Sequence, residues 1–178
     1  MKRLSALIIF VFAFACATHT IQPTLKNYQA NSPDEAKIID LILELQKAYD
    51  TQNLVKILAV YSHDAMLQTS TGQEDCAGVM LSKVEYANEL VKQIEFYKNC
   101  QIKLEISPPE KIQVQGGEAH MSSTYELYAR NPHKAFKESG VINFEFKKIA
   151  SGWLVSKRTW EVKECNHPDF KEWKAKQK

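Results

Sequence analysis

The sequence predicts an α+β fold in which three helices precede a mainly antiparallel sheet. In the first half of the chain, apolar residues recur at three- and four-residue spacing, which is typical of helices packed on one side. In the second half they alternate with polar residues, which is typical of half-buried strands. Short turns at Gly116 and Gly117 and at residues 150–152 separate these segments, so neighbouring strands are expected to run antiparallel.

The first helix is predicted from residue 33 to about residues 51–53. Ser32 can cap its N-terminus, Pro33 suits its first turn, and two acidic residues follow at the positive end of the helix dipole. A single apolar stripe then runs along the helix, formed by Ile38, Ile42, Leu45 and Tyr49. This pattern indicates one face packed against a core.

Two further helices are predicted, with a short hairpin between them. The second helix covers LVKILAVYSHDA (54–65), with an inward face of Leu54, Ile57, Leu58 and Tyr61. The hairpin consists of AMLQTS and its return, CAGVML. Ser82 caps the third helix, predicted over residues 82–97, and Glu85 lies at the capping-box position. Its apolar stripe is Val84, Ala87, Leu90, Val91 and Ile94.

The remaining chain is predicted to be almost entirely strand. The segments are QIKLEIS, KIQVQ, EAHMSSTYELYAR, GVINFEFKKI and WLVSKRTWEVKEC, with a loop predicted over NPHKAFKES. They form an antiparallel meander.

The N-terminus is typical of a secretory signal. Lys2 and Arg3 precede an apolar run over residues 4–14 that is too short to span a bilayer, and small residues follow. Ala-Phe-Ala-Cys, ending at Cys16, resembles the lipobox of bacterial lipoproteins, in which the cysteine is acylated. We therefore expect residues 1–16 to be a signal peptide and Cys16 to hold the protein to a membrane of the bacterial cell envelope. The alternative is ordinary cleavage nearby, which would give a periplasmic or secreted protein.

After the signal, we expect a tether over residues 17–32, one folded domain over 33–165 and a basic tail over 166–178. Net charge is close to neutral and no basic stripe with interleaved aromatic residues occurs, so nucleic acid is not expected as a partner. An exported protein can keep a disulfide, and Cys76, Cys100 and Cys165 allow one bond with an undetermined pairing. Their spacing is not that of a metal site, and no metal or cofactor is expected.

Two stretches resemble the nuclear transport factor 2-like fold, in its SnoaL-like and ketosteroid-isomerase-like branch. They are AYDTQNLVKILAVYSHDAML, where two helices lead into a strand, and the closing GWLVSKRTWEV. The resemblance implies a cone, formed by a curved sheet whose hollow the helices cover. Its members include enzymes, ligand-binding proteins and assembly modules, and many form dimers through the open sheet face. A homodimer is therefore expected by analogy, whereas the fold alone assigns no function.

Catalytic members use carboxylate, tyrosine or histidine groups inside the cone. The candidates here are Asp64, which is also suited to capping a turn, and the pair His120 and Glu126, which share one face of a predicted strand. Because the apolar residues of that strand should point inward, His120 and Glu126 are expected at the surface. No catalytic base can be transferred from the family to a matching position in this sequence.

The predicted ligand pocket is lined by aromatic side chains: Tyr49, Tyr61, Phe144, Phe146 and Trp160. The same side chains could instead fill the core. The sequence favours a lipid-anchored domain that binds a small apolar ligand or a protein partner without catalysis. The alternative is a small isomerase, dehydratase or cyclase acting on a hydrophobic substrate by acid–base chemistry.

Overall fold

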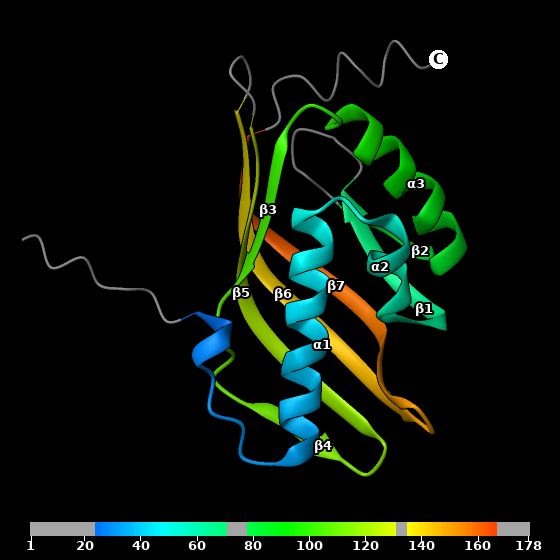
Figure 1. The fold of residues 1–178 in the computed structure, drawn as a ribbon, viewed down its shortest axis with the longest axis vertical. Coiled ribbons are helices and arrows are strands. Elements are labelled where there is room, and N and C mark those ends of the chain that lie inside the picture. Colours follow the sequence, from blue (N-terminus) through cyan, green and yellow to red (C-terminus); the bar gives the residue numbers. More distant parts are fainter. Residues whose placement is uncertain (1–23, 71–77, 131–134, 167–178) are drawn as a thin grey trace, which may run out of the picture.

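The computed structural model describes residues 24–70, 78–130 and 135–166, as a layer of helices on one face of a curved sheet (Figure 1). A short 3-10 helix, η1 (Leu25–Asn27), precedes the helices α1 (Pro33–Asp50) and α2 (Leu54–Ala59). The strands β1 (Tyr61–Ser70) and β2 (Gly78–Ser82) lead into α3 (Lys83–Phe96). The rest is strand: β3 (Gln101–Ile106), β4 (Ile112–Gln115), β5 (Glu118–Arg130), β6 (Ala135–Ile149) and β7 (Gly152–Asn166).

The sheet contains seven strands in the order β2-β1-β7-β6-β5-β3, and β4 also pairs with β5. All pairs are antiparallel except β1 and β7, which run parallel, so the expected mainly antiparallel sheet is confirmed. In Figure 1, α1 lies across the sheet and α3 lies over the β1–β2 end. The core is the apolar filling between this helix layer and the sheet.

The caps predicted for the two long helices are confirmed. The Ser32 hydroxyl accepts from the Glu35 amide at the start of α1. At the start of α3, the Ser82 hydroxyl accepts from the Glu85 amide, and the Glu85 carboxylate accepts from the Ser82 amide. Each cap satisfies amide groups that the helix itself leaves without acceptors.

The predicted second helix is too long, because the chain becomes a strand at Tyr61. The Val155 amide of β7 donates to the Val60 carbonyl at 2.9 Å, and Tyr61 is aligned with Val155 in the parallel β1–β7 pair. This pairing between segments distant in sequence outweighs the helical spacing of residues 54–65. Tyr61 still points inward and is 1% exposed, but it does so from a strand.

Two other boundaries and the buried face of α3 differ from the sequence prediction. Leu25 is 1% exposed within the core, so part of the segment expected to be a tether packs against the domain. The predicted loop over 131–139 overlaps β6, which begins at Ala135, while residues 131–134 lie outside the described residues. On α3, Tyr86 and Leu90 are buried, whereas Val84 and Val91 of the predicted stripe are 68% and 51% exposed. The helix is therefore rotated so that the Tyr86 ring enters the interior.

Several predictions concern residues that the structure does not describe. They include Cys16 and the signal, Cys76, the side chain of Cys165, and the C-terminal tail. The lipid anchor therefore stays a prediction, and the pairing of the cysteines stays undetermined. In the described part of the chain, no helix is long and apolar enough to cross a membrane.

Candidate functional site: a buried arginine among aromatic side chains

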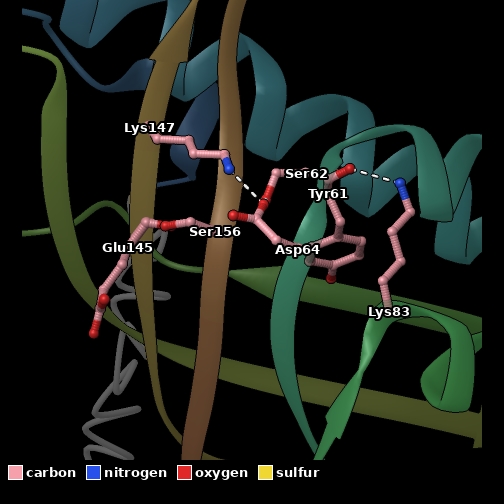
Figure 2. A network of polar contacts seen from close by, with 7 residues as sticks. All are labelled: Tyr61, Ser62, Asp64, Lys83, Glu145, Lys147 and Ser156. Atoms are coloured by element: carbon pink, nitrogen blue, oxygen red, sulfur yellow. Dashed lines mark hydrogen bonds and ion pairs between the residues drawn. The ribbon is translucent and has the colours of Figure 1, made fainter.

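A β-bulge in β7 directs two unusual residues into the interior. Val155 is aligned with Phe146 of β6, but Lys157 is aligned with Glu145, so Ser156 is an extra residue in β7. Figure 2 shows Ser156 beside β6, where its hydroxyl donates to the Glu145 carbonyl at 3.1 Å. The bulge changes which sequence positions point inward, from odd numbers before it to even numbers after it. Arg158 and Trp160 consequently face the helix layer.

Arg158 is 1% exposed, and its guanidinium is surrounded by phenol groups. Its Nη1 donates to the hydroxyls of Tyr61 at 2.7 Å, Tyr49 at 2.9 Å and Tyr86 at 3.3 Å. Its Nη2 donates to the Gln68 carbonyl at 3.1 Å. The phenols come from α1, β1 and α3, so the cluster joins both layers of the fold.

An aromatic stack continues from the guanidinium across the sheet. The Trp160 ring lies 4.4 Å from the guanidinium carbon of Arg158, in cation–π contact. Tyr125 stacks on Trp160 with ring centroids 5.8 Å apart, and its hydroxyl donates to the Glu138 carboxylate at 2.7 Å. Glu138 is 2% exposed. A buried cation and a buried carboxylate therefore lie at opposite ends of one stack.

The cluster around Arg158 has more hydrogen-bond donors than acceptors. The Nε of Arg158 and the indole Nε1 of Trp160 are both buried and find no hydrogen-bond partner among the residues that the structure describes. Among the described residues, no carboxylate forms an ion pair with Arg158. A buried arginine without a counter-ion is unusual, because removing its charge from water costs several kcal/mol.

Three buried phenols, those of Tyr61, Tyr86 and Tyr125, are held in their neutral form. Burial raises the pKa of Tyr61 and of Tyr86, although the charge of Arg158 opposes the rise. Burial and the Glu138 carboxylate likewise raise the pKa of Tyr125. These hydroxyls can donate or accept hydrogen bonds, but they are poorly suited to act as general bases near neutral pH.

A small cavity adjoins the cluster at Tyr49. Its volume is about 40 Å³, and its walls are mostly apolar side chains from α1, α2, α3 and the sheet, among them Ile57, Leu90, Ile94 and Leu127. At about 10–15 Å³ per water-sized group, this space holds about three such groups, whereas pockets for drug-sized ligands are on the order of 300–1,000 Å³. Larger hollows, of about 780 Å³ between η1, α1 and β3 and about 440 Å³ around β5 to β7, are open to solvent.

The five residues of the predicted pocket divide into two groups. Tyr49, Tyr61 and Trp160 meet around Arg158. Phe144 and Phe146 are each 1% exposed and stack on one another at 5.8 Å, so they form part of the packed core.

Asp64 lies outside this interior. Its carboxylate is 70% exposed, forms an ion pair with Lys147 of β6 and accepts from the Ser62 hydroxyl at 2.8 Å. Figure 2 shows the pair in front of β7, with α1 behind the sheet. Hydrogen bonds from Lys147 and then from Ser62 lower the pKa of Asp64 to about 2. The residue is suited to binding strands together at the surface rather than to taking up a proton.

His120 and Glu126 are not brought together. His120 is exposed on β5, where Glu145 is its neighbour on β6. Glu126 is six residues further along the strand, about 20 Å away at ~3.3 Å per residue, and accepts from the Tyr128 hydroxyl. Lys137 forms an ion pair with Glu126 at 3.4 Å. The outward orientation expected from the apolar pattern of this strand agrees with the burial of Met121.

Sequence reasoning missed Arg158, Glu138, Tyr86 and Tyr125. One signal could have found Arg158. In β7, the apolar positions Trp153 and Val155 are odd-numbered, whereas Trp160 and Val162 are even-numbered. Such a change of parity within one strand predicts a bulge between them, and a bulge before residue 158 points the arginine inward.

Neither metal ligation nor sequence similarity identifies the site further. Among the residues described, no three His, Cys, Asp or Glu side chains gather in a way that could hold a metal ion. A scan against models of protein families finds no match. A sequence search of curated proteins finds none either.

Comparison with solved structures identifies the fold. A protein of unknown function with a cystatin-like fold from Nostoc punctiforme is 20% identical, with a TM-score of 0.58 over 76% of this chain and 95% of that chain. An NTF2-like protein with a cystatin-like fold from Novosphingobium aromaticivorans is 13% identical, with a TM-score of 0.61 over 74% and 82%. A candidate aromatic ring hydroxylase from the same organism is 16% identical, with a TM-score of 0.63 over 76% and 93%. The chain has the nuclear transport factor 2-like fold, and the expected fold resemblance is confirmed.

Proposed function

We propose that this chain is an exported, lipid-anchored binding domain of the bacterial cell envelope, which holds a small, largely apolar ligand in its cone without catalysis. The composition of the interior carries the proposal. Around Arg158 the polar groups are the guanidinium, the Trp160 N–H, three phenol hydroxyls and the Gln68 carbonyl, enclosed by apolar and aromatic side chains. A few directed polar groups in apolar surroundings are typical of small-ligand sites.

The proposed location is supported by the N-terminal sequence. The basic residues, the apolar run and Cys16 follow the order of a lipoprotein signal, and acyl chains contribute ~0.8 kcal/mol per buried methylene to membrane binding. Cleavage without acylation would instead give a periplasmic or secreted protein. By analogy with proteins of this fold, we further propose that two copies pair through the sheet face that carries no helices. Analytical ultracentrifugation sedimentation of the detergent-solubilised protein tests whether it is a dimer.

Intact mass spectrometry of protein purified from the membrane fraction tests both parts of the proposal. The denatured mass should correspond to a chain that begins at Cys16 and carries acyl groups. The native mass should exceed it by a small molecule that denaturation releases. A bare polypeptide mass under both conditions would contradict the anchor and the ligand together.

One observation favours the enzymatic alternative. The Glu138 carboxylate is buried in the interior and accepts from the Tyr125 hydroxyl, so it could remove a proton from a substrate inside the cone. Incubating the full chain in D₂O with a panel of cyclic ketones tests this. Deuterium incorporation that Glu138→Gln abolishes, and that the surface change Glu126→Gln leaves intact, would replace the binding proposal by an isomerase-type activity.

A further inference from the structure

The Arg158 cluster is unbalanced in both charge and hydrogen bonding. The guanidinium carries one positive charge at 1% exposure, with no carboxylate paired to it among the described residues. In the described part of the chain, the Nε of Arg158 and the Nε1 of Trp160 have no acceptor. A buried donor without an acceptor destabilises the folded state, because it has lost its hydrogen bonds to water. An added group that accepts hydrogen bonds and carries negative charge would remove both costs.

We propose that Arg158 and Trp160 form the headgroup site of a small carboxylate ligand, an inference that rests on the proposed binding function and specifies its ligand class. A guanidinium hydrogen-bonds a carboxylate through its planar fork of N–H donors. The free Nε supplies one of those donors, and the indole of Trp160, stacked on the guanidinium, supplies another.

A monoanion fits this site better than a phosphate. One guanidinium balances one negative charge, whereas a phosphate dianion would leave a negative charge buried without a partner. The hydroxyl of Tyr61, which burial keeps neutral, can donate to a carboxylate oxygen but adds no positive charge.

The size of the adjoining space limits the ligand. Tyr49 both contacts Arg158 and lines the cavity of about 40 Å³, whose other walls include Ile57, Leu90 and Ile94. A carboxylate near Arg158 would direct a short apolar chain toward this cavity. A longer chain would require α2 or α3 to move away from the sheet.

Butyrate and its neutral isostere butyramide test the assignment. The full chain, labelled with ¹⁵N, is titrated with each compound while the indole N–H resonance of Trp160 is followed, after assignment with Trp160→Phe. Butyrate should bind at least about tenfold more tightly than butyramide, because a hydrogen bond to a charged group is stronger than one between neutral groups. Butyrate should also move the Trp160 resonance downfield.

Two variants distinguish recognition of the carboxylate by Arg158 from binding of the apolar chain alone. Arg158→Met should weaken butyrate binding about tenfold and leave butyramide binding unchanged. Arg130→Gln, which changes an exposed arginine at the end of β5, should leave both unchanged. If Arg158→Met does not fold, Trp160→Phe provides the same comparison by isothermal titration calorimetry, because it keeps an aromatic ring against Arg158 and removes the indole N–H.

Equal affinity of the wild type for the two compounds, or no binding of butyrate, would overturn the carboxylate assignment. A different result would contradict the proposed binding function: protein isolated in its native state would release no ligand on denaturation.

Discussion

Arg158→Met tests whether the buried arginine serves ligand binding or stability. The arginine makes four hydrogen bonds, to three phenols and one carbonyl. At ~1.5 kcal/mol each, they stabilise the fold by roughly 6 kcal/mol. Burying a charge that no carboxylate of the described residues pairs costs several kcal/mol. A methionine of similar length keeps the apolar contacts. We therefore expect the free energy of unfolding to change by no more than about 2 kcal/mol, in either direction.

Urea unfolding of the full chain measures this change. Phe144→Ala is the calibrating variant, because it removes an uncharged side chain that is 1% exposed and should cost about 3–5 kcal/mol. If Arg158→Met destabilises the protein by as much as Phe144→Ala, Arg158 is mainly a structural residue. The reasoning that links its missing counter-ion to a ligand would then be refuted.

Three further predictions test the fold around the site. The Gly140→Ala variant should unfold at a markedly lower urea concentration than wild type, because the added Cβ would lie 2.0 Å from the Glu161 carbonyl oxygen. Gly117→Ala is the control and should be tolerated, because the nearest atom to its added Cβ is 4.0 Å away. Ser82→Ala removes the cap of α3 and should cost about 1 kcal/mol, measured as a lower Tm by calorimetry. The stability that Asp64 contributes should be fully present above its ordinary pKa of 3.8 and should disappear as the pH falls toward its folded pKa of about 2. The free energies of unfolding of Asp64→Asn and wild type should therefore converge in acid.

Each of these predictions has a clear contrary result. Equal urea midpoints for the two glycine variants would show that β6 and β7 are not as close as described. An unchanged Tm after the Ser82 change would mean that α3 does not depend on its cap. A difference between Asp64→Asn and wild type that grows in acid would reverse the sign of the proposed pKa shift.

Local signals in the sequence are sufficient to predict where α1 and α3 begin. Ser32 and Ser82 cap helices because a hydroxyl accepts from an amide three residues away, and this interaction depends only on neighbouring residues. The end of α2 depends on a distant segment, since β7 pairs with the chain at Tyr61. Helical spacing of apolar residues cannot reveal that pairing, and the predicted helix was therefore too long.

The central residue of the site was missed for a related reason. A charged residue on a strand normally points to solvent, and Arg158 lies between the polar residues Lys157 and Thr159. Only the extra residue Ser156 directs it inward, through the register of β7 against β6. The aromatic side chains were easier to identify, since large apolar residues are expected inside wherever the strand alternates.

The central claim is that Arg158 holds a ligand in the cone, and native mass spectrometry of the membrane-derived protein tests it most directly. Wild type and Arg158→Met are purified from their own membranes under identical conditions. We predict that wild type carries a small molecule that denaturation releases, that this molecule is detected as an anion, and that Arg158→Met lacks it. A wild-type protein without any such molecule, or the same molecule bound equally to both proteins, would contradict the claim.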